Sequence, residues 1–109
     1  MNITDLRDSW TESAHASRHL ARTEPKNENY WEGRVIAFET GVELLKQHAA
    51  HPRQALTELH EAINEAIAAN PTKREDIDEV SARAHQLHDL VAELSAALDQ
   101  HPAQEGVRT

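Results

Sequence analysis

One stretch of the chain decides the fold: residues 77–98, IDEVSARAHQLHDLVAELSAAL. Apolar residues recur in it at steps of three and four, the spacing that places side chains on one face of an α-helix. These residues, here called the seam, are Ile77, Val80, Ala84, Leu87, Val91, Leu94 and Leu98. They occupy the a and d positions of three heptads, a stripe that is stable only when it packs on another helix. The sequence therefore predicts a long C-terminal heptad helix that packs against other helices through the seam.

The residues before the seam carry the signals of a helix start. Pro71 ends the preceding element, and the hydroxyl of Thr72 can accept a hydrogen bond from a free amide of the first turn. Glu75, three residues later, can accept from the amide of Thr72 in return. We therefore expect the long helix to begin with a capping box at Thr72 and Glu75.

Residues 3–22 predict an earlier helix, with Asn2 or Thr4 able to cap its start. Its expected stripe is Ile3, Leu6, Trp10, Ser13, Ser17 and Leu20. Because serine contributes little apolar area, Trp10 should supply much of the contact between this helix and the rest of the chain. Residues 23–29 contain a proline and two asparagines among charged residues and predict a loop.

A second helix is expected to open at Asn29 as its N-cap, and its stripe is Trp31, Val35, Phe38, Val42, Leu45 and Ala49. Proline disfavours helical geometry in the residue before it but suits the first position of a new helix. We therefore expect one helix to end near Ala50 and another to begin at Pro52. The later residues Leu56, Leu59, Ile63 and Ala66 keep the same heptad phase. A single helix over residues 29–69, kinked at the proline, is thus an open alternative.

Together these segments predict an all-α protein, an antiparallel helical bundle of three to four helices. The chain has 109 residues, which is the size of one domain. We assign residues 1–101 to a single helical domain and expect residues 102–109 to form a frayed tail.

Composition excludes several classes of protein. The formal net charge is −8, from 19 acidic against 11 basic residues, which is unsuited to binding phosphates. We expect no binding to nucleic acid, although an acidic inhibitor that imitates nucleic acid is an alternative. The absence of cysteine excludes disulfides and fits the reducing cytoplasm. No apolar run has membrane length, and the N-terminus lacks the pattern of a signal peptide, so we expect a cytoplasmic protein with no membrane contact.

Eight histidines raise the question of a metal site. The best-spaced group is Glu12, His15 and His19, which share one face of the first predicted helix. Metal sites in helical bundles project their ligands inward, whereas this face lies opposite the stripe of Trp10. We therefore expect no metal and no cofactor, and keep a His/Glu metal-binding helical protein as an alternative.

No motif indicates an enzyme. The sequence contains no nucleophile elbow, and its three glycines form no phosphate-binding loop. We expect a protein without catalytic residues.

The most individual stretch is Tyr30-Trp31-Glu32-Gly33-Arg34, which holds two of the aromatic residues. Glycine in a helix costs about 1 kcal/mol relative to alanine, so we expect another backbone to approach Gly33 closely. Tyr30, Trp31 and Gly33 join the seam as candidate interaction residues, and a tryptophan anchor packed over a small residue is the alternative.

This stretch resembles two known groups of proteins. The Tyr-Trp-x-Gly-Arg stretch, followed by Ala37 and an apolar stripe, resembles small uncharacterised helical proteins of actinobacteria and their phages over about twenty residues. That resemblance implies no activity. Trp31-x-Gly33 is also similar to the Trp-x-Gly turn of secreted helical-hairpin proteins that pair as dimers, although Arg34 stands where that family carries an acid of its export signal.

The leading hypothesis from the sequence is a non-enzymatic protein–protein interaction module, of the accessory or regulatory kind found in phages and mobile elements. Its protein partner is unknown. Because one chain offers few large side chains to cover the seam, we also expect a homodimer that forms through it.

Overall fold

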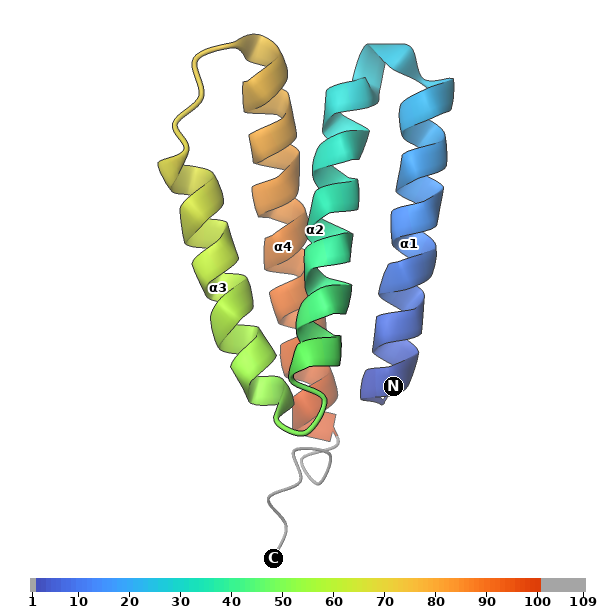
Figure 1. Ribbon diagram of the computed structural model, residues 1–109, viewed down its shortest axis with the longest axis vertical. Helices are drawn as coiled ribbons and strands as arrows, with labels where there is room; N and C mark the ends of the chain where they lie inside the picture. Colours follow the sequence, from blue (N-terminus) through green and yellow to red (C-terminus); the bar gives the residue numbers. More distant parts are fainter. Residues whose placement is uncertain (1, 101–109) are drawn as a thin grey trace, which may run out of the picture.

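The computed structural model describes residues 2–100 as four α-helices and one short 3₁₀ turn (Figure 1). The helices are α1 (Ile3–Thr23), α2 (Glu28–Gln47), α3 (Pro52–Ala68) and α4 (Arg74–Gln100), and the 3₁₀ turn η1 covers Pro25–Asn27. This confirms the predicted all-α bundle, in its version with four helices. The predicted tail at residues 102–109 lies outside the described residues.

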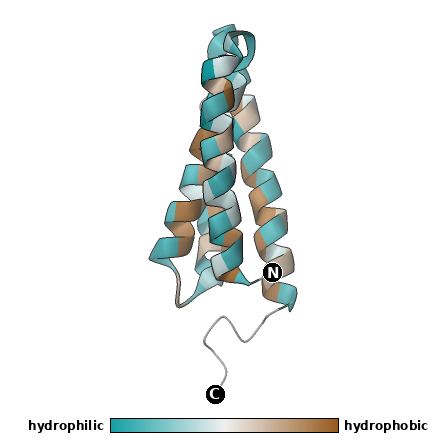
Figure 2. Ribbon diagram, turned by 90° about the vertical axis from the view of Figure 1, so that its right-hand side faces the viewer, coloured by the Kyte–Doolittle hydropathy of each residue, from teal (hydrophilic) through white to brown (hydrophobic). Residues whose placement is uncertain are grey.

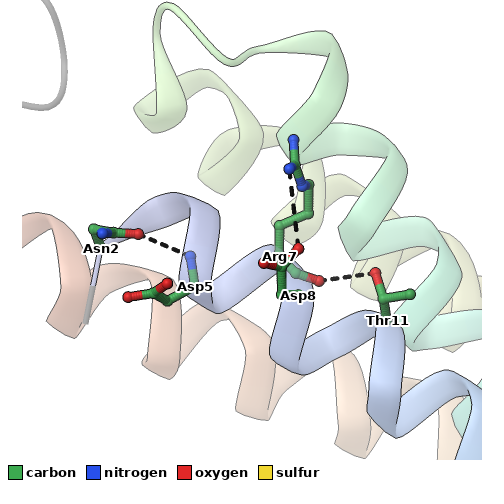
Figure 3. Close-up of polar contacts among 5 residues, drawn as sticks. All are labelled: Asn2, Asp5, Arg7, Asp8 and Thr11. Carbon is green, nitrogen blue, oxygen red and sulfur yellow. Dashed lines mark hydrogen bonds and ion pairs between the residues drawn. The ribbon is translucent and has the colours of Figure 1, made fainter.

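Asn2 caps α1, one of the two residues predicted to do so (Figure 3). Its side-chain oxygen accepts a hydrogen bond from the backbone N–H of Asp5 at 2.8 Å. Further along α1, the hydroxyl of Thr11 donates to the carbonyl of Arg7 at 2.9 Å. The carboxylate of Asp5 also lies in the first turn, where the helix dipole favours negative charge. Local chemistry therefore fixes where α1 begins.

Two predicted caps are wrong. Asn29 lies inside α2, because η1 runs directly into the helix and moves its start to Glu28. The capping box at Thr72 and Glu75 does not form either. α4 begins at Arg74, and its first backbone hydrogen bond joins the N–H of Ile77 to the carbonyl of Lys73 at 2.9 Å. The non-helical segment that leads from α3 thus reaches one residue beyond the predicted cap.

α2 and α3 are two helices rather than one kinked helix. α2 ends at Gln47, three residues before the predicted end, and α3 begins at Pro52 as predicted. Between them the chain reverses, with the N–H of His51 bonded to the carbonyl of His48 at 3.0 Å. Beside this turn the imidazole of His48 contacts the carboxylate of Glu58 on α3.

The four helices form a flattened bundle. Consecutive helices run antiparallel, so α2 and α4 run parallel (Figure 1). α2 packs on α4 and on α1 to about the same extent, α3 packs mainly on α4, and α1 has little contact with α4. We call the α2–α4 pair the short diagonal of the bundle, because these two helices pack against each other in the middle while α1 and α3 lie on either side of them. As a result, α3 has one main neighbour instead of two.

Small residues on α2 explain the short diagonal. Gly33, Ala37 and Gly41 follow one another at steps of four, on one face of the helix, and all three are buried. A Cβ atom at Gly33 would overlap the backbone carbonyl of Glu79 and lie 3.0 Å from the Cβ of Ala82. The predicted close approach of another backbone to Gly33 is therefore confirmed, and the backbone belongs to α4.

The core is built around Trp10 of α1, which is only 1% exposed. Its ring lies directly over Gly41, where an added Cβ would come within 2.8 Å of a ring carbon. Its indole N–H donates to the carboxylate of Glu93 on α4 at 3.2 Å. Brown apolar segments alternate with teal ones along the helices (Figure 2), as expected for helices that bury only one face.

The seam is only partly buried within one chain. Leu87, Leu94 and Leu98 are fully buried by helices of the same chain, whereas Val80, Ala84 and Val91 are half-buried. Ile77 is 46% exposed. The buried face also includes Ala82, Gln86, Leu90 and Ala97, which lie off the seam. The buried face of α4 is therefore rotated relative to the predicted seam. α4 contacts α2 on one side and α3 on the other, whereas a heptad pattern describes packing on a single partner helix.

Candidate functional site

The aromatic residues predicted as an interaction site contact one another and Arg34. The rings of Tyr30 and Trp31 meet edge to face with centroids 4.9 Å apart. The guanidinium of Arg34 lies 5.2 Å from the ring centroid of Trp31 and 5.7 Å from that of Phe38, within the range of cation–π attraction. Trp31 is half-buried, and Tyr30 is exposed. These contacts all lie within one chain, so the geometry supports the alternative interpretation, in which Trp31 is a packing anchor of the bundle.

The Trp31-Glu32-Gly33 segment lies within α2 and not in a turn between two helices. The chain therefore lacks, at this segment, the turn on which the resemblance to secreted helical-hairpin proteins depends. Gly33 serves helix packing instead, since its missing side chain lets α4 approach.

The candidate metal ligands Glu12, His15 and His19 all lie on α1, and all three are exposed. Within residues 2–100, no group of three or more His, Asp or Glu side chains is arranged to hold a metal ion. His48 instead contacts the carboxylate of Glu58.

A hollow of about 590 Å³ lies between α1 and α2. Its lining combines bases of α1 with acids of α2, and Arg18 forms an ion pair with Glu39 across it. Arg18 and Glu39 are thus already paired within the chain, and we do not assign this hollow a ligand.

A second hollow, here called the α3/α4 groove, has a volume of about 500 Å³ and a different character. It lies where α3 and α4 diverge toward the loop that joins them (Figure 1). The lining residues are Ile63, Ile67, Asn70, Pro71, Ile77, Val80, Ser81, Ala84, His85 and His88. Two of them are among the most exposed large apolar side chains of the described residues: Ile67, 65% exposed, and Ile77, 46% exposed. The groove therefore presents an uncovered apolar surface to solvent.

The α3/α4 groove also lacks formal charge. The lining residues include no Asp, Glu, Lys or Arg, although the chain carries 30 such residues, 19 acidic and 11 basic. Its polar groups are the side chains of asparagine, serine and histidine. In a chain with a formal net charge of −8, an exposed apolar surface without charged lining residues is a candidate interaction site.

Some of the residues that line the groove were predicted as interaction residues, and others were not. Ile77, Val80 and Ala84 come from the N-terminal half of the predicted seam, and the remaining seam residues do not line it. Sequence reasoning missed Ile67, because it lies next to the stripe position Ala66 and has no place in the heptad pattern. Its signal was an isoleucine off the stripe in a chain with few large apolar residues.

Comparison with protein families, with curated proteins and with solved structures gives no match. Among residues 2–100, none of the helices combines the length and the apolar character needed to cross a membrane.

Proposed function

We propose that this chain is a non-enzymatic protein–protein interaction module and that its α3/α4 groove is the surface that binds the partner. One observation carries the proposal: Ile67 and Ile77 stand exposed on the two helices that form an uncharged groove. Burying one isoleucine side chain contributes roughly 1.5–3 kcal/mol, so a partner that covers both gains appreciable free energy.

The arrangement of the bundle explains why this surface is left uncovered. The close contact of α2 with α4 leaves α3 with one main neighbour. The half-buried side chains of Ile63, Val80 and Ala84 then face the groove, where a third helix or another protein surface can pack on them. Recognition of this type uses apolar anchors on a helical surface and needs no catalytic group.

We propose a cytoplasmic setting and an accessory or regulatory role of the kind found in phages and mobile elements. The lack of cysteine and the resemblance of the Tyr30–Arg34 stretch support this setting. The proposal includes self-association, with a homodimer as the working form.

Site-specific photo-crosslinking in the native host tests the proposed surface. With a photoreactive amino acid at position 67, we expect discrete crosslinked bands that mass spectrometry identifies as protein adducts. The matched control places the same amino acid at Ala16, an exposed residue of α1, and should give none of these bands. Equal bands from both positions, or none from position 67, would show that the groove is not the binding surface.

A further inference from the structure

We infer that the occupant of the α3/α4 groove is the same groove of a second copy of this chain, related to the first by a two-fold axis. This inference rests on the proposed function and names the partner. It differs from a dimer formed through the whole seam, because Leu87, Leu94 and Leu98 are already buried within one chain.

The charge distribution favours a second copy. Each chain carries a formal net charge of −8, so two copies repel one another unless the surfaces that meet lack like charges. The α3/α4 groove meets this condition, since its lining contains no acidic residue. A basic partner, by contrast, would gain most from the acidic surfaces and little from an uncharged one.

The shape of the groove points the same way. In a two-fold dimer the same patch occurs on both sides of the interface, so it must contain both a protrusion and a recess that accepts it. Ile67 supplies the protrusion, with 65% of its surface exposed near the end of α3. The recess is the hollow that Ile67 lines together with the half-buried Val80 and Ala84. Two copies can therefore exchange their Ile67 side chains.

The size of the patch sets the expected affinity. Stable interfaces use roughly 20–30 residues on each side, and the groove is lined by 10. The dimer should therefore be weak, with dissociation constants in the micromolar range or above, and its population should depend on protein concentration.

Sedimentation equilibrium of the untagged chain tests the inference. We expect the mass to rise from monomer to dimer with concentration and not beyond. Ile67→Asp should raise the Kd at least about a hundredfold, because the symmetry removes the side chain twice. Ala68→Asp adds the same charge at the next residue, which is exposed and does not line the groove, and should leave the Kd within about threefold of the parent value.

A second variant guards against loss of folding. Ile77→Asp places a negative charge in the first turns of α4, where the helix dipole favours it, so helix content by circular dichroism should hold while the dimer is lost. A parent that stays monomeric at millimolar concentration, that forms larger oligomers, or that dimerises equally well with Ile67→Asp would overturn the inference. Photo-crosslinks from position 67 to another protein would in that case still support the groove as the surface that binds a protein partner, while removing the homodimer from the proposed function. The absence of any crosslink from position 67 would end both proposals.

Discussion

Trp10→Ala is expected to lower the free energy of unfolding by about 3–5 kcal/mol, the range for removing a buried tryptophan. Trp10 is 1% exposed, packs over Gly41 of α2, and donates its indole N–H to Glu93 of α4. Trp10 thus contacts both α2 and α4 from α1. Since small domains have total stabilities of about 5–15 kcal/mol, the variant should be close to unfolded. Urea denaturation followed by circular dichroism measures the loss.

Two control variants separate packing from hydrogen bonding at this site. Trp10→Phe keeps an aromatic ring over Gly41 and should lose much less stability than Trp10→Ala. Glu93→Ala removes only the acceptor of the indole N–H and should cost about 1 kcal/mol. A loss below about 1 kcal/mol for Trp10→Ala would contradict the buried position of the ring.

Gly33→Ala is expected to lower the free energy of unfolding by about 2 kcal/mol, although alanine is the better helix former by about 1 kcal/mol. The new methyl group would overlap the backbone carbonyl of Glu79 and press on the Cβ of Ala82. A backbone atom cannot rotate out of the way as a side chain can, so α2 and α4 must move apart. The separation would disturb the contact on which the flattened bundle depends.

Gly41→Ala is the matched control for this prediction. Its new Cβ would meet the tip of the Leu90 side chain and the ring of Trp10, both at 2.8 Å and both side-chain atoms. Leu90 can change rotamer, whereas the buried Trp10 ring has little room to move. We therefore expect a loss of about 1 kcal/mol, smaller than at Gly33, where the overlap is with a backbone atom. A Gly33→Ala variant as stable as the parent in urea would show that the backbones of α2 and α4 are not in direct contact.

Much of the fold could be predicted because it depends on local patterns. Apolar residues at steps of three and four predict the helix α4, because this spacing places them on one face. Pro52 predicts the start of α3, because proline suits the first position of a helix. Gly33 was also informative, because a glycine that weakens a helix indicates close packing. The caps at Asn29 and Thr72 failed because helix starts shift by a residue or two with the neighbouring segment. η1 continues into α2 and moves its start before Asn29, whereas the non-helical segment after α3 extends past Thr72 to Lys73.

The position of the groove could not be predicted because it depends on which helices become neighbours. The heptad pattern correctly places Leu87, Leu94 and Leu98 in the interior. It cannot show that α4 turns its N-terminal half toward Gly33 and leaves Ile77 exposed. Ile67 is a candidate only once α3 and α4 are seen to diverge beside it.

The central claim, that the α3/α4 groove is the interaction surface and a second copy its occupant, is tested most directly by nuclear magnetic resonance. Backbone amide signals of the isotopically labelled chain would be followed from micromolar to millimolar concentration. The expected result is a set of concentration-dependent shifts confined to residues 63–71 and 77–88, with the signals of α1 unchanged. Signals that do not move with concentration, or that move on α1 and not beside the groove, would contradict the claim.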